Sequence, residues 1–571
     1  MEKQVYEFIA VQNGEKILEW KKCPSCDQEF AITDKDLEFY AKISPVFNGK
    51  KYTIPVPTLC PDCRQQTRLT RRNERKLYKR KCDLTGRSVI SIYSPDLGYK
   101  VYDVNEWFGD KWDAVDYGKD FDFNRTFMEQ FDELLKSVPH MNIMVMNNEN
   151  SDYVNMSANV KDCYLIFGSS QNTNCLYDRW TMNSDRVVDC NNVSQSQNCY
   201  ECIDINNCQN STYCIECYDC VECNGCYNLI WCNNCIGCYN LRNKTYCIDN
   251  KQYTKQEYEL LKENYKNYEK ILDSINLNSI HKYAKLLSSE NCFGDYISQS
   301  KNVECGFDIE KSEDLKYVTN TLELKDSYDL DFQAFNTSRV FDSLGVENAY
   351  NIYFSFWAIV NNNVYYSYLS LNSSNLFGCA CIRDKHYCIL NKQYTKEEYE
   401  ELVPKIIEHM QKTWERWQYL KSSISPFGYN ETIANEYFPL TRDEAISKWF
   451  KRQEKEYPIN VPEWIELIKW QDLSDNIKDI DDDILKKAVV CEVSWKPFRI
   501  VKLELDFYRK HNLPLPRKHP DIRHLERLNK RAPRTLYLKT CDNCGKQVIS
   551  VYPQNSEFKV YCEDCYVKET Y

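Results

Sequence analysis

The sequence lacks a long apolar run, a glycine-rich nucleotide loop and a histidine metalloprotease motif. Its longest apolar stretches, such as residues 142–146 and 355–360, fall far short of the roughly twenty residues of a membrane-spanning helix. Only 15 glycines occur in 571 residues, and none builds a Walker or dinucleotide-binding loop. The seven histidines include no HExxH pair. These absences argue against a membrane-spanning protein and against the enzyme classes that such motifs mark.

A secretory signal is also missing. The opening residues, MEKQVYEF, have neither the basic start nor the apolar stretch of such a signal, so we expect a cytoplasmic location. The chain nevertheless carries 30 cysteines. Because disulfides are rare in the cytosol, we expect these cysteines to be free thiols or metal ligands. The hydrophobic content of 43% and the charged content of 27% are typical of a folded protein, and the length predicts several domains.

Charge is distributed unevenly along the chain. The net charge is -11, but residues 1–110 hold 19 Lys and Arg against 16 Asp and Glu, and residues 491–571 hold 16 against 10. The remaining residues, 111–490, hold 38 against 58. The ends are therefore basic and the middle is acidic, so the whole-chain charge does not exclude nucleic-acid binding by the terminal modules.

Each end of the sequence contains two CxxC pairs. They are Cys23/Cys26 with Cys60/Cys63, and Cys541/Cys544 with Cys562/Cys565. Two such pairs can bring four thiolates together around Zn²⁺ in a tetrahedron. Buried free thiols or a redox CxxC pair are the alternatives, and the presence of two pairs at each end favours metal. The sequence therefore predicts two zinc ions.

The two ends are related copies, and each contains two ribbon-like units. Residues 82–103 align with residues 541–562 without a gap, and the same register aligns residues 64–75 with residues 523–534. Farther upstream, after a change in length, Cys23 and the LEFY segment 37–40 match Cys491 and the LDFY segment 505–508.

One unit of each copy has lost its metal ligands. The second N-terminal unit has Cys82, Thr85, Asp103 and Glu106 at the four positions, and the first C-terminal unit has Cys491, Ser494, His519 and Ile522. Neither set can complete a tetrahedral site as aligned, so we expect one zinc ion at each end. Aromatic packing, by Trp107 or Trp495, is expected to replace the metal in the degenerate units.

The run CPSCDQEFAITDKDLEFYAK followed by IPVPTLCPDCR resembles a family of small bacterial probable zinc-binding domains of treble-clef type. In that family a CxxCxxxF hook and an EFY segment precede a CPxCR hook, and this sequence departs from the pattern in an inserted NGKKYT stretch. Most of the chain resembles long, uncharacterised bacterial zinc-ribbon proteins with a Cys-rich repeat, through phrases such as RNERKLY, YGKDFDF and YCILNKQYTKEEYE. The resemblance implies zinc binding and brings no established activity.

Between residues 163 and 247 the cysteines recur at a fixed short spacing. One row is spaced by six residues and contains Cys202, Cys208, Cys214, Cys220, Cys226, Cys232 and Cys238. A second row, offset by three, contains Cys199, Cys217, Cys223 and Cys235. A short period rich in Asn, Asp and Ser is typical of a β-solenoid. A cadence near twelve residues from Val303 to Leu376 predicts that coils continue there, with the coil length left open.

These cysteine rows have three interpretations. Thiols can fill a narrow solenoid interior as small apolar side chains, which is the favoured interpretation. They can also form a metal or iron–sulfur array, or disulfide ladders. If the thiols only pack, we expect Cys220→Ala to be tolerated and Cys220→Ser to be destabilising, because a buried hydroxyl needs a partner.

Both solenoid stretches end with the same phrase. Residues 246–255 read YCIDNKQYTK and residues 387–396 read YCILNKQYTK. Thr254 with Glu257, and Thr395 with Glu398, have the spacing of capping boxes that begin a helix. We expect these helices to cover the last coil, whose edge would otherwise attract further strands.

A run of basic residues follows the second hook of each first unit. On a helix, the N-terminal run would place five cations on one face: Arg64, Arg68, Arg72, Arg75 and Lys79. The C-terminal copy repeats Arg523, Arg527 and Arg531 before Pro533 interrupts the helix. We interpret the run as a cationic ridge that binds phosphates, and the alternative is a solvated helix face.

The predicted fold is a multidomain α+β protein in which duplicated zinc-ribbon or treble-clef modules flank a Cys-rich β-solenoid with capping helices. The expected boundaries are terminal modules at 1–110 and 491–571, a helical connector at 111–155, solenoid stretches at 156–253 and 286–394, a capping helix at 254–285 and a helical region at 395–490.

Two classes of function fit this organisation, and an enzyme of unknown class comes third. The first is a non-enzymatic zinc protein whose terminal modules bind nucleic acid, such as structured RNA or a ribonucleoprotein, with the solenoid as spacer or protein-docking surface. The second is a protein-interaction scaffold, in which the arginines pair with acidic groups on a partner or on the protein's own solenoid.

Overall fold

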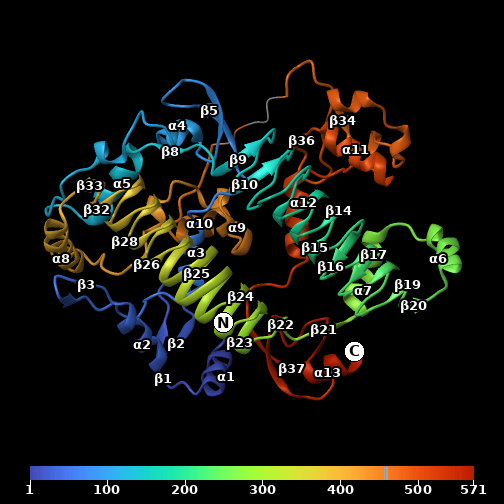
Figure 1. Ribbon diagram of the computed structural model, residues 1–571, viewed down its shortest axis with the longest axis horizontal. Coiled ribbons are helices and arrows are strands. Elements are labelled where there is room, and N and C mark those ends of the chain that lie inside the picture. The colour runs from blue at the N-terminus through green and yellow to red at the C-terminus, as the bar shows by residue number, and fades with distance from the viewer. Residues whose placement is uncertain (456, 458–460) are drawn as a thin grey trace. The chain divides into compact units, whose positions relative to one another are not determined.

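The computed structural model describes residues 1–571 except 456 and 458–460. It has an α+β fold that divides into two compact units. One unit contains Met1–Asn142, Lys282–Gln453 and Pro533–Ser556, and the other contains Ile143–His281, Glu454–Ala532 and Glu557–Tyr571. Each unit is built around its own stretch of β-solenoid, which Figure 1 shows as stacked short strands.

The first solenoid stretch lies in the second unit and consists of parallel strands. They are β9 (Val145–Glu149), β10 (Ser157–Lys161), β11 (Arg179–Met182), β12 (Asp185–Val188), β13 (Asn191–Ser194), β14 (Gln197–Tyr200), β15 (Ile203–Asn206), β16 (Thr212–Ile215), β17 (Val221–Tyr227), β18 (Asn233–Ile236) and β19 (Thr245–Ile248). Cys214 pairs with Cys226, and Cys235 pairs with Cys247. Paired residues are twelve apart, so each coil has twelve residues and the six-residue cysteine spacing is half a coil.

The second solenoid stretch lies in the first unit and has the same coil. Its strands are β22 (Leu286–Leu287), β23 (Glu290–Ser298), β24 (Lys301–Glu310), β25 (Glu313–Glu347), β26 (Tyr350–Tyr353), β27 (Phe356–Ile359), β28 (Asn362–Tyr365), β29 (Tyr368–Leu371), β30 (Ser374–Phe377), β31 (Ala380–Arg383) and β32 (His386–Ile389). Val303 pairs with Leu315, and Val364 pairs with Leu376. The predicted continuation of the coils is confirmed.

A residue in the left-handed backbone region occurs at every third position of most coils. In one coil these residues are Glu201, Asp204, Asn207 and Asn210, with φ between 50° and 54°. Asn and Asp tolerate this conformation better than other residues with a side chain, which explains their frequency in the solenoid sequence. Four such corners turn twelve residues into four short sides.

Every third side chain points into the solenoid, and in the first stretch 15 of the 22 residues of the buried apolar core are cysteines. Cys202, Cys214, Cys226 and Cys238 form one file along the interior, and each is completely buried. All these cysteines are free thiols, and they pack with valines, isoleucines and leucines in one core. Burial raises the pKa of the Cys214 thiol well above its usual value. The burial of these thiols in an apolar core agrees with the interpretation that they fill the solenoid interior.

Serine also occupies inward positions, which bears on the expected effect of Cys220→Ser. The Ser211 hydroxyl is fully buried and donates a hydrogen bond of 3.0 Å to the carbonyl of Gln209, two residues earlier. The Cys220 thiol donates in the same way to the carbonyl of Tyr218, at 3.2 Å. A buried hydroxyl at position 220 therefore has a partner in the backbone of its own coil.

Each solenoid stretch ends in a short antiparallel strand and a capped helix. These elements are β20 (Lys251–Gln252) with α6 (Lys255–Leu261), and β33 (Lys392–Gln393) with α8 (Lys396–Lys412). Both predicted capping boxes are present, formed by Thr254 with Glu257 and by Thr395 with Glu398. Each helix packs a tyrosine on the last coil: the rings of Tyr258 and Tyr246 are 5.6 Å apart, and those of Tyr399 and Tyr387 are 5.8 Å apart. In the first stretch, α7 (Tyr268–Asn278) and β21 (Ile280–Lys282) follow.

The terminal modules repeat the same series of elements, as the duplication predicts. The N-terminal copy contains β1 (Ile17–Lys22), β2 (Glu29–Thr33), α2 (Asp34–Ile43), α3 (Pro61–Leu69), β5 (Tyr78–Lys81), β6 (Ser88–Ser91), β7 (Val101–Tyr102) and α4 (Val104–Trp107). The C-terminal copy contains β35 (Ala488–Val490), β36 (Pro497–Phe498), α11 (Lys502–His511), α12 (Pro520–Asn529), β37 (Tyr537–Thr540), β38 (Gln547–Ser550), β39 (Lys559–Tyr561) and α13 (Glu563–Thr570).

The remaining segments are short. They comprise α1 (Lys3–Asn13), β3 (Val46–Phe47), β4 (Lys50–Lys51), α5 (Phe127–Ser137), β8 (His140–Met141), α9 (Ile433–Tyr437), α10 (Arg442–Ser447) and β34 (Leu467–Lys469). The region 395–490 was expected to be helical, but its described residues form α8, short helices, the strands β34 and β35, and loops, and four of its residues lie outside the described ones. Within the described chain, no helix is both long enough and apolar enough to cross a membrane.

We expect Cys220→Ser and Cys220→Ala each to lower the free energy of unfolding by only about 1 kcal/mol. Alanine removes a small buried volume, while serine keeps a donor for the Tyr218 carbonyl. Urea denaturation of the full chain measures both changes. A loss of several kcal/mol for both variants would contradict a purely packing role for this thiol.

Candidate metal centres and arginine clusters

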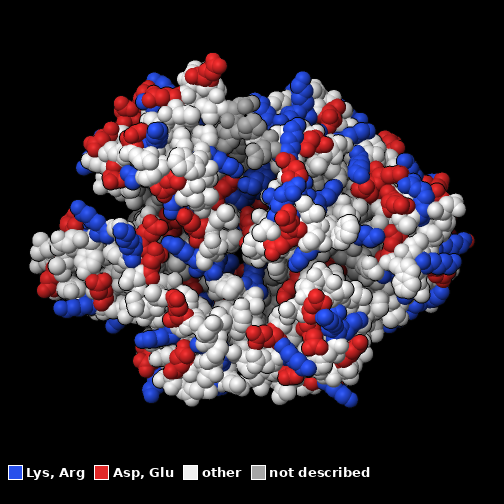
Figure 2. Space-filling model, turned by 180° about the vertical axis from the view of Figure 1, so that it is seen from behind, with Lys and Arg blue, Asp and Glu red and all other residues white. Residues whose placement is uncertain are grey.

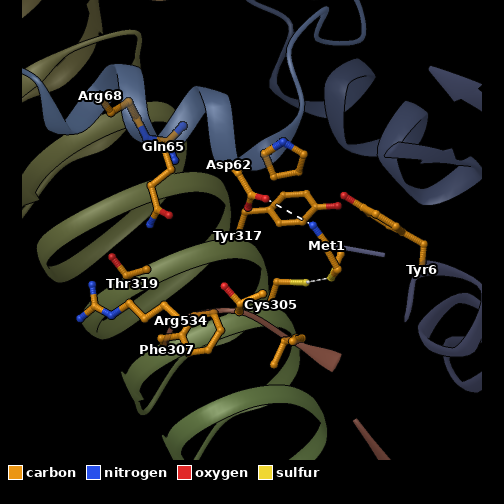
Figure 3. Close-up of a pocket in the computed structure, with 13 residues that line it drawn as sticks. Met1, Tyr6, Asp62, Gln65, Arg68, Cys305, Phe307, Tyr317, Thr319 and Arg534 are labelled. Atoms are coloured by element: carbon orange, nitrogen blue, oxygen red, sulfur yellow. Dashed lines mark hydrogen bonds and ion pairs between the residues drawn. The ribbon is translucent and has the colours of Figure 1, made fainter. Parts of the chain in front are cut away.

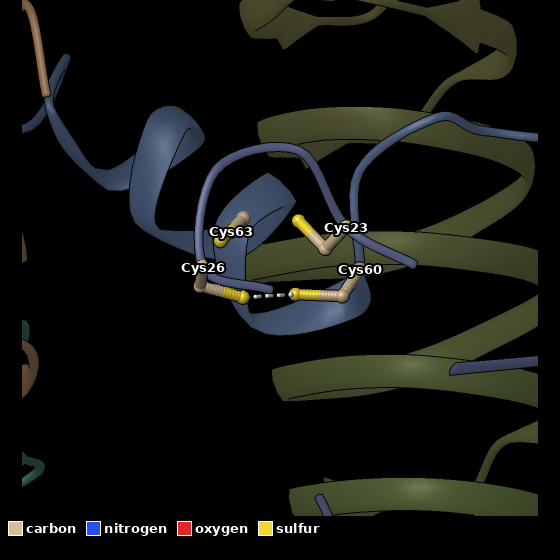
Figure 4. A group of neighbouring side chains, drawn as sticks. All are labelled: Cys23, Cys26, Cys60 and Cys63. Carbon is tan, nitrogen blue, oxygen red and sulfur yellow. Dashed lines mark hydrogen bonds between the residues drawn. The ribbon is translucent and has the colours of Figure 1, made fainter. Parts of the chain in front are cut away.

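The N-terminal centre is formed by the two predicted cysteine pairs. Cys23 and Cys26 lie in the loop that joins β1 to β2, while Cys60 is the residue before α3 and Cys63 lies in the first turn of α3. Their four sulfur atoms all lie within 4.8 Å of one another. Figure 4 shows Cys26 and Cys60 facing each other, with their sulfur atoms 3.5 Å apart. Four sulfurs around a zinc ion at about 2.3 Å would be about 3.8 Å apart, so the donor set fits a tetrahedral ion.

The thiols of this centre differ in how readily they ionise. Burial raises the pKa of the Cys26 thiol to about 11, and the hydrogen bond with Cys63 raises the pKa of the Cys60 thiol. Burial opposes ionisation of Cys23, but hydrogen bonds from the backbone of Cys60, Ser25 and Cys26 lower the pKa of its thiol to about 7. Metal binding requires deprotonated sulfur, so a thiol that ionises near neutral pH suits a ligand.

The C-terminal centre has the same composition and a more open setting. Cys541 and Cys562 are buried, Cys565 is half-buried and Cys544 is exposed. Their sulfur atoms also lie within 4.8 Å of one another. Cys562 is the residue before α13, as Cys60 is the residue before α3. Within the described residues, these are the two groups of cysteine, histidine or carboxylate side chains with the geometry of a metal site.

The degenerate units use hydrogen bonds and ion pairs where a metal would stand. The backbone N–H of Asp103 donates to the Cys82 sulfur at 3.3 Å, and Glu106 pairs with Arg87 at 2.6 Å. In the C-terminal copy, the backbone N–H groups of Val493 and Ser494 donate to the Cys491 sulfur, each at 3.4 Å.

Of the two tryptophans expected to replace the metal, only one is in a core. Trp107 is completely buried, and its indole N–H donates to the carbonyl of Pro139 at 2.9 Å. Trp495 is 71% exposed, so the expectation for this residue is wrong. The C-terminal degenerate unit instead shares a core with the first solenoid stretch, formed by residues such as Leu505, Phe507 and Tyr508.

The N-terminal basic run does not form the predicted five-cation ridge. Helix α3 ends at Leu69, so Arg72, Arg75 and Lys79 lie beyond it, and Lys79 belongs to β5. Arg64, Arg68 and Arg72 are buried, Arg75 is half-buried and Lys79 is exposed. A phosphate backbone cannot reach the three buried guanidinium groups without moving the helix or its surroundings.

Arg64 and Arg68 pair with aspartates of the second solenoid stretch. Arg64 lies 2.8 Å from a carboxylate oxygen of Asp329. Arg68 lies 2.8 Å from Asp331 and 2.8 Å from Asp342. Burial raises the pKa of the Asp342 carboxyl to about 6, although the charge of Arg68 acts to lower it. Figure 3 shows Arg68 and Gln65 on α3 beside the coils, where a cavity of about 40 Å³ has room only for a few waters.

Arg72 pairs locally instead. Its guanidinium lies 2.6 Å from the carboxylate of Glu74 and covers the ring of Phe332 at 4.6 Å. This residue therefore joins the same face of the solenoid through an aromatic contact.

The C-terminal copy repeats this arrangement on the first solenoid stretch. Arg523 pairs with Asp189, and Arg527 lies 2.9 Å from Asp189 and 3.0 Å from Glu201. Arg531, beyond the end of α12, lies 2.9 Å from Asp204. These carboxylates stand at left-handed corners of the solenoid, as Asp329 and Asp342 do. We call the two sets of pairs the arginine clasps.

The distribution of charge along the sequence was consistent with the clasps, but the spacing of the arginines alone did not predict them. The acidic middle of the chain supplies the carboxylates, and the alternative that the arginines pair with the protein's own solenoid describes what the structure contains. Comparison with protein-family models and with curated proteins finds no match, so the resemblance to treble-clef domains stays a prediction supported by the two cysteine clusters.

We expect the purified chain to carry two metal ions. Cys26→Ser and Cys544→Ser each remove one ligand of one centre, so each variant should retain about one ion and the double variant none. Elemental analysis of freshly purified protein measures the stoichiometry. Two ions retained by the double variant would contradict the assignment of these ligands.

Proposed function

We propose that the protein is a non-enzymatic scaffold in which zinc-bound terminal modules hold a β-solenoid for binding to other proteins. The observation that supports the proposal is the burial of the terminal arginines against solenoid carboxylates. Because these arginines pair within the protein, they are not exposed for binding to phosphates. Zinc is favoured over other metals because four cysteine thiolates in a closed tetrahedral set are typical of structural zinc sites.

The solenoid surface suits an interaction role. Its corners bear ladders of hydrogen-bonded amides, such as Asn351 to Asn363 at 2.9 Å and Asn363 to Asn375 at 3.2 Å. Such ladders hold outward side chains in fixed register over successive coils, as in other repeat proteins that bind partners along an extended face.

Nucleic-acid binding is the second candidate function. It would require cationic residues other than the buried arginines to contact the phosphates. Arg64, Arg68, Arg523 and Arg527 are buried in ion pairs, which leaves Lys79 as the exposed member of the predicted set in the N-terminal module. In Figure 2, acidic and basic side chains are mixed over the visible surface instead of forming one basic field. Strong phosphate binding needs several cations that act together.

We expect the full chain to show no salt-dependent binding to nucleic acid between 50 and 200 mM salt. Fluorescence anisotropy with a single-stranded RNA, a hairpin RNA and a duplex DNA measures it. A protein with several phosphate contacts would lose about a thousandfold or more in affinity over that range. If such binding appears and Lys79→Gln weakens it, while Lys255→Gln on the capping helix α6 does not, the nucleic-acid function replaces the scaffold.

A further inference from the structure

Helix α3 connects the N-terminal metal centre to an arginine clasp. Its first residues supply two of the four sulfur ligands, Cys60 and Cys63. Arg64 and Arg68 lie on the same helix and pair with aspartates of the solenoid. No side chain caps the start of α3 by a hydrogen bond, so the sulfur–metal bonds and the ion pair between Asp62 and the N-terminal amine would fix its first turn.

The metal-site cysteines are a large part of what holds this helix end in place, beside contacts such as the ion pair of 3.3 Å between the N-terminal amine and Asp62. Its core contains seven buried residues, and three of them are the metal-site cysteines Cys23, Cys60 and Cys63. Without a metal, Cys23, Cys26, Cys60 and Cys63 lose the ion that would join the two CxxC pairs to each other. Buried ion pairs alone do not compensate well for the water that their charges lose, so the clasp needs a helix that is already in position.

The far end of α3 has its own contacts. Gln66 donates to the hydroxyl of Tyr429 at 2.7 Å, and Ser425 donates to the carbonyl of Thr70 at 2.7 Å. These bonds tie the end of α3 to the segment after α8, so loss of the metal should free the first turns without unfolding the solenoid.

The C-terminal clasp is the equivalent contact in a unit that lacks a full set of metal ligands. His519 precedes helix α12 and caps it, because its ring nitrogen accepts a hydrogen bond of 3.1 Å from the backbone N–H of Asp521. Its module shares a core of fifteen buried residues with the solenoid, and Glu504 within the module also faces Arg523 at 3.7 Å.

We propose that the metal at Cys23, Cys26, Cys60 and Cys63 operates the N-terminal clasp. With the ion bound, α3 is fixed and Arg64 and Arg68 stay on Asp329, Asp331 and Asp342. Loss of the ion releases the start of α3, so the clasp opens while the α12 clasp stays closed. Opening exposes Arg64 and Arg68 together with the aspartates that they covered.

The experiment compares two matched double variants of the full chain by hydrogen–deuterium exchange. Cys23→Ser/Cys26→Ser removes the first hook of the N-terminal centre and leaves α3 unchanged. Cys541→Ser/Cys544→Ser removes the equivalent hook of the C-terminal centre. Elemental analysis confirms that each variant has lost one ion, and chelator titration of the unmodified chain gives an independent route to the metal-free state.

In the N-terminal variant we expect exchange about tenfold faster or more in residues 61–69 and in 329–342, with no change in 520–529 or in 185–205. The C-terminal variant should leave all four segments unchanged. Unchanged exchange in residues 61–69 after loss of the N-terminal ion would overturn the proposal, and so would equal acceleration in α12. The inference does not depend on the scaffold function, since exchange reports the clasp whether or not a partner protein exists.

Discussion

A guanidinium group taken out of water has to meet carboxylates, and at both ends of this chain a stretch of β-solenoid supplies them. Arg68 meets Asp331 and Asp342, while Arg527 meets Asp189 and Glu201. Removing one partner from such a cluster would leave buried, uncompensated charge, which typically costs about 3–5 kcal/mol. The clasps therefore specify where each terminal helix lies on its coil.

The twelve-residue coil makes this arrangement possible. A left-handed residue at every third position favours Asn and Asp at the corners, and side chains twelve residues apart stand above one another on successive coils. Asp189 and Glu201 are such a pair, and together they receive Arg527. The same geometry gives the interior four narrow files, where a thiol or a hydroxyl can donate to the carbonyl two residues earlier.

Local patterns in the sequence were sufficient for several features of the fold. The CxxC pairs predicted both sulfur clusters, the Thr254 and Thr395 phrases predicted the capping helices, and the cysteine rows predicted the solenoid. In each case the spacing of nearby residues fixes the geometry. The coil length was not predictable, because rows spaced by six fit a six-residue and a twelve-residue coil equally well.

Features that depend on distant parts of the chain were missed. The spacing of the N-terminal arginines fits a continuous helical face, but α3 ends at Leu69, and Arg68 finds its aspartates more than 260 residues away. Trp495 was expected to replace the metal by aromatic packing, yet the core of its unit is shared with the solenoid and the tryptophan is exposed. Nothing in the neighbouring sequence of either residue encodes its tertiary partner.

A double-mutant cycle between Arg68 and Asp331 in the full chain tests the central claim most directly. The variants are Arg68→Met, Asp331→Asn and their combination, with free energies of unfolding from urea denaturation. If the pair is buried and direct, the two changes should be coupled by about 1–3 kcal/mol, with the double variant less destabilised than the sum of the single ones. Additive effects within about 0.5 kcal/mol would contradict the clasp.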